Sequence, residues 1–176
     1  MKFTGNRALI LGGNCDLAIT LARHMIEAGL FPLLTYRNEK GLEYISNNLK
    51  DSPKRYSSFY LEFGNRDSID SLLHQTGDDI DFMVDFAQGN FESLVASADV
   101  DRIYSYFAEN VSFRAEVVKR VARIMLKNKE AVLFIFLHQR QQDPIMARDF
   151  MQRQSLHLKP FIKIWVWNLV GKVLQL

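Results

Sequence analysis

The chain alternates short apolar runs with longer segments whose apolar residues recur at helical spacing, and this alternation constrains its fold more than any other feature. Apolar runs of strand length lie at 7–11, 31–36, 59–63, 80–87 and 131–136. The four segments between them have the period of a helix; Gly29 is expected to end the first, Asp67 to cap the third, and the fourth is expected to run over 98–127. We therefore predict an α/β protein with a three-layer, doubly wound parallel sheet. The sheet is expected to be incomplete at its C-terminal side, because the pattern fails after Phe136.

The composition fits one domain and gives no reason to expect a membrane or nucleic-acid role. Of the 176 residues 48% are hydrophobic, which is enough for a core, and the formal net charge is only +2. The single cysteine, Cys15, excludes an internal disulfide and fits a reducing compartment. No apolar run typical of a secretory signal opens the chain, and the apolar segment 161–176 is shorter than the roughly 20 residues of a membrane span. We expect a cytoplasmic protein.

The composition changes sharply inside the fifth apolar run. Acidic residues outnumber basic ones by 18 to 16 through Phe136, whereas residues 137–176 contain six basic and two acidic residues. Both tryptophans and six of the eight glutamines also lie in this last segment. A domain boundary normally lies in an exposed linker rather than in a buried strand. We therefore divide the chain into a half-domain, 1–136, and a tail, 137–176, of different origin.

The turn after the first apolar run has the composition of a phosphate-binding turn. Gly12 and Gly13 allow a tight turn and a close approach of the backbone, and the helix that follows directs its N-terminal N–H groups toward an anion. Such a turn, with Asn14, Asp16 and Leu17, suits the pyrophosphate of a dinucleotide in a Rossmann-like fold. The alternative is an ordinary strand-to-helix turn, because such turns use glycine anyway and the strict three-glycine fingerprint is absent.

The segment from Leu11 to Ala18 resembles the first turn of the short-chain dehydrogenase/reductase family, which reads Thr-Gly-x-x-x-Gly-Ile-Gly. Gly12 matches the first glycine, Asp16 stands where the second is usual, and Leu17 with Ala18 replaces Ile-Gly. The resemblance is to 3-oxoacyl-carrier-protein-reductase-like members and extends to Phe136, about half of a family chain. It implies binding of a dinucleotide, with the carboxylate of Asp16 directed away from the pyrophosphate.

Further matches follow in the order of the family. Arg37 ends the second apolar run where the family reads the adenosine ribose, and a basic residue there implies NADP(H) rather than NAD(H). By the same resemblance, Glu62 and Phe63 at the third run contact adenine. Phe86 and Ala87 at the end of the fourth run match the stretch that the family has after its fourth strand. Asn110 matches the asparagine that holds the water of the family's proton relay. Arg37 could instead be a solvated strand-end residue, and a core hydrogen bond could equally explain Asn110.

The residues that perform the family's chemistry are absent. A serine should follow the fifth run and a Tyr-x-x-x-Lys motif should come about a dozen residues later, but no tyrosine occurs after Tyr106. If each codon is read from the last base of one residue and the first two bases of the next, the tail acquires such a pattern. The shifted frame permits Ser, then thirteen positions later Tyr, and four positions after that Lys, at Leu137/His138, Phe150/Met151 and Gln154/Ser155. We therefore interpret the tail as the product of a one-base frameshift; the rival interpretation is a genuine evolved tail.

Three functions remain open from the sequence. The first is an NADP(H)-dependent oxidoreductase for a small carbonyl or alcohol substrate, inactive as written because Ser, Tyr and Lys are missing. The second is a non-catalytic dinucleotide-binding module, and the third is a non-functional truncated remnant. The four histidines are scattered without metal-ligand spacing, so no metal is expected. We expect no nucleic-acid or membrane partner, and a homo-oligomer is possible through the long helix that carries Asn110.

Overall fold

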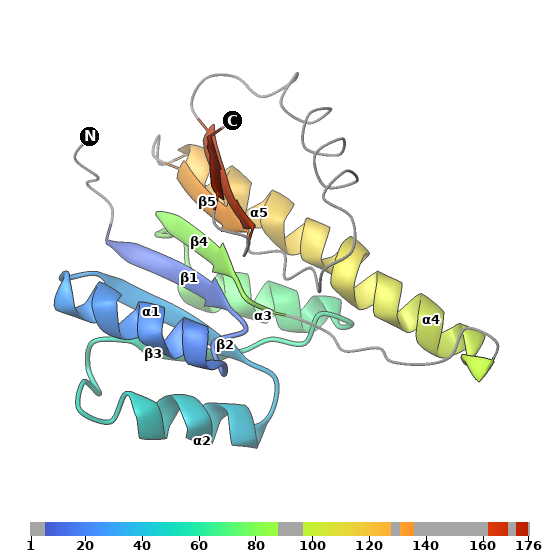
Figure 1. Ribbon diagram of the computed structural model, residues 1–176, viewed down its shortest axis with the longest axis horizontal. Helices are drawn as coiled ribbons and strands as arrows, with labels where there is room; N and C mark the ends of the chain where they lie inside the picture. The colour runs from blue at the N-terminus through green and yellow to red at the C-terminus, as the bar shows by residue number, and fades with distance from the viewer. Residues whose placement is uncertain (1–5, 88–96, 128–130, 136–161, 169–171, 176) are drawn as a thin grey trace.

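The computed structural model describes residues 6–87, 97–127, 131–135, 162–168 and 172–175 (Figure 1). Its strands form one sheet in the order β3-β2-β1-β4-β5-β6-β7. The strands are β1 Arg7–Leu11, β2 Phe31–Tyr36, β3 Ser57–Tyr60, β4 Phe82–Asp85, β5 Ala131–Ile135, β6 Ile162–Asn168 and β7 Lys172–Gln175. The helical elements are α1 Asp16–Glu27, α2 Glu39–Asn48, α3 Arg66–Thr76, α4 Val100–Phe107, the π-helical turn η2 Ala108–Phe113 and α5 Arg114–Lys127.

The first five strands are parallel, as predicted. In the register of β1, Leu9 lies beside Leu33 of β2 and beside Met83 of β4. After β3 the chain crosses to β4, which pairs with β1 on the side opposite β2, and β5 extends the sheet next to β4. Two parallel neighbours whose connections run to opposite sides leave a crevice at the carboxyl ends of the strands, which is where such sheets bind ligands.

Helices cover both faces of the sheet, so the predicted three-layer arrangement is confirmed (Figure 1). Alternate residues of β1 face opposite sides: Leu9 and Leu11 pack toward α3 and α5, and Ile10 packs toward α1 and α2. The core on the first side is completed by buried helical residues, which are Ile69, Leu72, Leu73, Val117, Val121 and Met125. The core on the other side is completed by Ala18, Ile19, Ala22, Ile26, Ile45 and Leu49.

Several predicted boundaries need correction. The third strand is Ser57–Tyr60 rather than 59–63, and the fourth is Phe82–Asp85 rather than 80–87. The flanking Leu61 and Ile80 are buried as strand residues are, which is why the apolar runs are longer than the strands. Asp67 does not cap α3; the Asn65 side chain accepts hydrogen bonds from the N–H groups of Asp67 and Ser68, at 2.9 and 3.3 Å. The prediction that Gly29 ends α1 is confirmed, since Gly29 has φ +84°.

The last two strands lie in the segment for which no regular element was expected. β6 pairs with β5 in parallel, and β7 pairs with β6 antiparallel. Lys163 and Lys172 interrupt the apolar character of this segment, which is why its periodicity gave no strand signal. In the part of the chain that the structure describes, no helix is both long enough and apolar enough to cross a membrane.

Candidate dinucleotide-binding site

The two glycines of the first turn are required by the strands on either side of them. Gly12 has φ +70°, and a Cβ there would lie 2.6 Å from the backbone nitrogen of Ala87, just after β4. A Cβ at Gly13 would lie 2.7 Å from Cβ of Leu34 in β2. Both contacts are closer than packed carbon atoms tolerate, so a larger residue would push the turn away from the sheet. The close approach predicted for a pyrophosphate therefore also serves packing within the chain.

Thr35 anchors this turn from β2. Its hydroxyl accepts a hydrogen bond from the Gly12 N–H at 3.0 Å, and its carbonyl accepts one from the Gly13 N–H at 2.8 Å. The side chain is buried, and a buried hydroxyl without a partner would be costly. Thr35 was not predicted as a site residue; its signal in the sequence is a polar residue inside an otherwise apolar strand.

The N-terminus of α1 is open to an anion. Cys15 holds the N-cap position in an extended conformation, and its side chain makes no hydrogen bond to the helix. The N–H groups of the first turn therefore lack a side-chain cap, and they carry the positive end of the helix dipole. Leu17 lies in this turn with 59% of its surface exposed, although it is apolar. An uncapped N-terminus beside an exposed apolar side chain suits a ligand that has both a phosphate and a ring.

Asp16, the first residue of α1, is hydrogen-bonded to the neighbouring helix α2. Its carboxylate accepts a hydrogen bond from the hydroxyl of Tyr44 in α2. This hydrogen bond raises the pKa of Tyr44 above its usual value, and the nearby charge of Asp16 adds to the effect. The negative charge is thus engaged with the neighbouring helix.

The second strand-to-helix turn lies beside the first. Asn38 caps α2, since its side-chain oxygen accepts a hydrogen bond from the Gly41 N–H at 2.9 Å. A Cβ at Gly41 would lie 3.4 Å from Cβ of Asn14 and 3.4 Å from Cβ of Tyr36. Asn14 of the first turn therefore lies close to the end of β2 at Tyr36. Because Arg37 follows Tyr36 directly, the two turns form one continuous edge.

Arg37 is paired across this edge with a residue that the sequence analysis did not single out. Its Nη1 lies 3.4 Å from Oε2 of Glu109, which belongs to η2. The side chains are 60% and 32% exposed, respectively, so the pair is accessible to solvent. Glu109 also lies beside Gly64, where an added Cβ would be 3.7 Å from Oε1.

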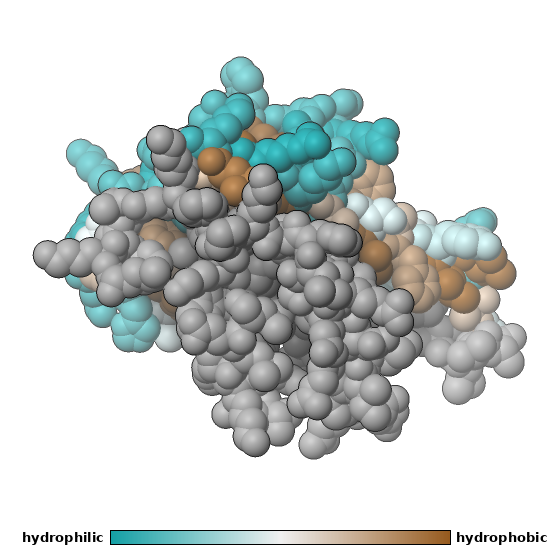
Figure 2. All heavy atoms as spheres, turned by 90° about the horizontal axis from the view of Figure 1, so that it is seen from above, coloured by the Kyte–Doolittle hydropathy of each residue, from teal (hydrophilic) through white to brown (hydrophobic). Residues whose placement is uncertain are grey.

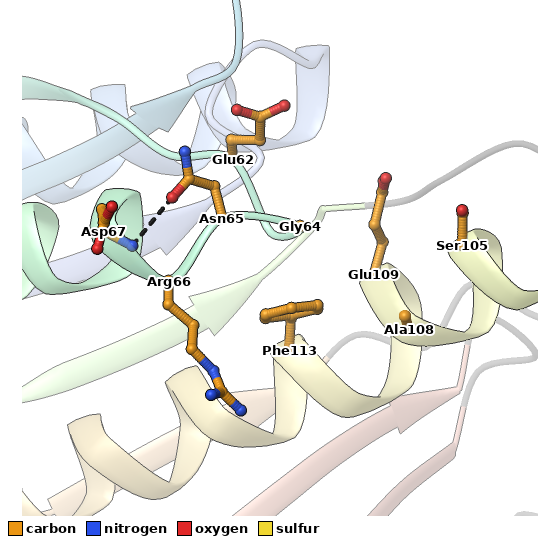
Figure 3. A pocket seen from close by; sticks show the side chains of 9 residues that line it. All are labelled: Glu62, Gly64, Asn65, Arg66, Asp67, Ser105, Ala108, Glu109 and Phe113. Atoms are coloured by element: carbon orange, nitrogen blue, oxygen red, sulfur yellow. Dashed lines mark hydrogen bonds between the residues drawn. The ribbon is translucent and has the colours of Figure 1, made fainter.

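Glu62 and Phe63 lie on the loop after β3; Glu62 lines a pocket of about 810 Å³, whereas Phe63 packs against the core on the side of α3 and α5. Glu62 accepts a hydrogen bond from the Tyr60 hydroxyl at 3.0 Å, which raises the pKa of Tyr60. In Figure 3 the helix residues face the loop across the pocket. The lining residues are Glu62, Gly64, Asn65, Arg66, Asp67, Ser105, Ala108, Glu109 and Phe113.

A buried ion pair lies behind the loops at the end of β4. Oδ2 of Asp85 is 3.0 Å from Nε of Arg114, without the alignment of a hydrogen bond, and the two side chains are 1% and 16% exposed. Burial raises the pKa of Asp85 to about 6, although the charge of Arg114 and the Ala87 N–H, which donates to Oδ1 at 2.9 Å, act in the opposite direction. The guanidinium of Arg114 also lies 5.7 Å from the centre of the Phe63 ring.

Phe86 and Ala87 are held at the end of β1. The Phe86 N–H donates to the carbonyl of Leu11 at 2.9 Å, and the Phe86 side chain packs against the core that α1 and α2 cover. Ala87 packs against the other core. These two predicted residues and the glycine turn are thus brought together.

Asn110 lies in a π-helical turn rather than in a regular helix. The predicted helix over 98–127 is interrupted by η2, and the Asn110 side chain donates a hydrogen bond to the carbonyl of Tyr106 at 2.9 Å. π-helical turns occur frequently at functional sites. The hydrogen bond between Asn110 and Tyr106 lies within the helix itself, and the relay role of Asn110 stays a prediction. The positions of the predicted frameshifted motif, from Leu137 to Ser155, lie outside the residues that the structure describes.

The predicted residues that follow β1 to β4 thus lie at the carboxyl ends of these strands, where their chemistry fits a dinucleotide, whereas Asn110 lies in η2. The uncapped helix N-terminus suits its pyrophosphate, and Arg37 suits a phosphate on the ribose. Four residues of this site were missed because their partners are distant in sequence: Thr35, Asp85, Glu109 and Arg114. Among the described residues, no group of three or more histidine, cysteine or acidic residues could hold a metal.

A mainly parallel sheet with this strand order and a glycine turn after β1 is typical of the doubly wound, Rossmann-like class of α/β folds. More narrowly, the chain has the fold of the short-chain dehydrogenases/reductases. A short-chain dehydrogenase from Streptomyces avermitilis superposes with a TM-score of 0.73 at 16% identity, over 94% of this chain and 65% of that one. An actinorhodin polyketide ketoreductase solved with NADPH gives 0.75 at 17% identity, over 92% of this chain and 69% of that one.

A protein described as a 3-oxoacyl-reductase from Bacillus thuringiensis gives a TM-score of 0.67 at 18% identity, over 77% of this chain. The chain spans 59% of that relative, so it corresponds to only part of these proteins. No model of a known family matches the sequence, and no curated protein sequence does.

Proposed function

We propose that this chain is the dinucleotide-binding part of a short-chain oxidoreductase and that it binds NADP(H) at the carboxyl edge of β1 to β4. The observation that carries the proposal is the uncapped N-terminus of α1, next to the exposed Leu17. It lies on the same edge as Arg37, because Asn14 of its turn lies close to the end of β2. The class of small carbonyl or alcohol substrates follows from the fold resemblance. A polyketide ketoreductase of the same fold was solved with NADPH, which supports the choice of cofactor.

Each predicted residue has a proposed role at this edge. Gly12 and Gly13 hold the turn, while Asn14, Asp16 and Leu17 lie where it meets the pyrophosphate and the rings. Arg37 would pair with the 2′-phosphate of the ribose. Glu62 and Phe63 would face adenine, Phe86 and Ala87 would line the floor between β1 and β4, and Asn110 would hold the relay water.

The chain itself is proposed to bind without turnover. When bound, a nicotinamide ring supplies or accepts a hydride, but after the fifth strand this sequence has no tyrosine, and therefore no Tyr-x-x-x-Lys motif there to move the accompanying proton. We propose that the motif lies one reading frame away in the tail 137–176, so that residues 1–136 form the half-domain of the family. Sequencing the DNA across the codons of Ile135 to Leu137 tests this, and a neighbouring frame without the motif would refute it.

The alternative is a remnant that no longer binds. It is favoured by apolar side chains left on the surface of the long helix, where Tyr104, Phe107 and Val111 are 69%, 58% and 58% exposed. Figure 2, in which the N-terminal end of this helix projects to the right, shows apolar surface there. The same residues support the proposal of a homo-oligomer. A cytoplasmic location, expected from the single cysteine, also stays a proposal.

Titration of the 176-residue chain with NADPH, followed by cofactor fluorescence and calorimetry, tests the proposal. We expect saturable binding by the wild-type chain and no reduction of simple carbonyl compounds. Arg37→Gln should weaken NADPH binding about tenfold, because it removes a charge-assisted contact with a phosphate. Arg123→Gln is the matched control, since Arg123 is an exposed residue of α5.

Two results would contradict the proposal. A folded chain, verified by circular dichroism, that binds neither NADPH nor NADH would support the remnant. Turnover of a carbonyl substrate by the purified chain would instead show that another residue replaces the missing tyrosine.

A further inference from the structure

The strongest unassigned feature of this edge is the carboxylate of Glu109, which is paired with Arg37. We propose that Glu109 is a specificity-determining residue that competes with the 2′-phosphate of NADP(H) for Arg37 and thereby lowers the preference of this chain for NADP(H) over NAD(H). This inference rests on the proposed function. It concerns a residue to which neither the sequence pattern nor the resemblance assigns a role.

The Arg37–Glu109 pair joins two distant parts of the chain at this edge. Arg37 follows β2, and Glu109 comes from a helical turn 72 residues later, yet Nη1 and Oε2 are 3.4 Å apart. The Glu109 side chain extends from η2 toward the loop that carries Gly64, as Figure 3 shows. The carboxylate therefore lies on the same edge as the two turns that are proposed to bind the dinucleotide.

The surroundings of the pair are mainly acidic. Glu62 and Asp67 line the same pocket as Glu109, and Arg66, which also lines it, is already 3.6 Å from Glu116. Among the described residues that line this pocket, acidic groups outnumber basic ones by three to one. A 2′-phosphate that approaches Arg37 must therefore lie beside a carboxylate and displace it.

The two cofactors differ at the adenosine ribose, where NAD(H) has a 2′-hydroxyl and NADP(H) a 2′-phosphate. A 2′-hydroxyl can donate a hydrogen bond to a carboxylate, so NAD(H) can bind while Arg37 and Glu109 stay paired. A phosphate carries close to two negative charges and has only acceptor oxygens, so it requires the pair to separate. The Arg37–Glu109 pair is solvent-accessible, and such pairs are weak; separating one lowers affinity by no more than about fivefold. Repulsion between phosphate and carboxylate adds to this effect.

The test is a comparison of dissociation constants for NADPH and NADH, measured by calorimetry on the 176-residue chain and on Glu109→Gln. The glutamine keeps the size of the side chain and removes its charge. We expect NADPH to bind about three- to tenfold more tightly to the variant, with NADH changed by less than about twofold. Glu27→Gln, at the end of α1, removes the same charge far from Arg37 and should change neither constant.

The same measurements in an Arg37→Gln background separate the mechanism from simple repulsion. If Glu109 acts through Arg37, its substitution should change the NADPH constant much less when Arg37 is absent. An undiminished effect in this background would overturn the inference, and so would an unchanged NADPH-to-NADH ratio in Glu109→Gln. If neither the wild-type chain nor any variant binds either cofactor, the proposed function is refuted, and this inference is refuted with it.

Discussion

The buried carboxyl of Asp85 makes the stability of this protein depend on pH in a direction opposite to that of an ordinary surface carboxylate. Burial raises its pKa from 3.8 to about 6 because the side chain is shielded from water, and Arg114 at 3.0 Å offsets only part of this effect. The folded protein therefore holds the proton more tightly than the unfolded chain. Its contribution to the free energy of unfolding is fully present below about pH 4 and is lost as the pH rises through about 6.

The magnitude follows from the two pKa values. At about 1.36 kcal/mol per pH unit, the difference between 3.8 and about 6 corresponds to about 3 kcal/mol. Asp85→Asn is neutral at every pH and resembles the protonated acid in shape. We therefore expect the wild-type chain to lose about 3 kcal/mol of unfolding free energy relative to this variant between pH 4 and pH 8.

Urea unfolding of both proteins at a series of pH values, followed by circular dichroism, measures this difference. Effects of the other carboxylates cancel because the two proteins share them. Asp51→Asn is the control, since Asp51 is an exposed carboxylate whose removal changes the net charge equally. A difference that stays constant or grows in favour of the wild type with rising pH would mean that Arg114 outweighs burial, and the reasoning would be refuted.

Two further pairs of substitutions test the local structure by the same unfolding measurement. Gly12→Ala should cost about 2–4 kcal/mol, because it combines a positive φ with a contact to Ala87, whereas Gly29→Ala, with a similar φ and open space around it, should cost only about 1–2 kcal/mol. Equal losses would show that the close approach to β4 is unimportant. Asn65→Ala should cost about 1 kcal/mol as the loss of a helix cap, and Asp67→Ala less than that, because Asp67 only lies in the first turn of α3; the reverse order would restore Asp67 as the cap.

Much of the fold could be predicted because it is encoded locally. The order of strands and helices and the glycine turn follow from apolar periodicity and from residues with special backbone freedom. Boundaries were less accurate where local signals compete: Asn65 and Asp67 are both good helix caps, and only the geometry of the loop selects Asn65. The strands β6 and β7 gave no signal because lysines interrupt their apolar residues.

The site was only partly predictable, for a different reason. The turn at Gly12 and the strand-end Arg37 belong to short sequence patterns, and the structure places them on one edge. The partners of the charged residues could not be read from the sequence, because Arg37 and Glu109 are 72 positions apart. Asp85 did give a signal: a charged residue at the end of a buried strand needs a partner, although the sequence does not say which.

The π-helical turn sets the two halves of the long helix out of phase. A regular helix rotates about 100° per residue, and η2 accommodates roughly one residue more in its turn than an α-helix would. α5 can therefore keep Val117, Val121 and Met125 against the sheet while Glu109 reaches the end of β2. Deleting one residue from η2 would rotate the upstream half of the helix by about 100° relative to α5, with the core contacts intact and the charged edge disassembled. The geometry of this edge thus depends on the length of a single helical turn as well as on the residues in it.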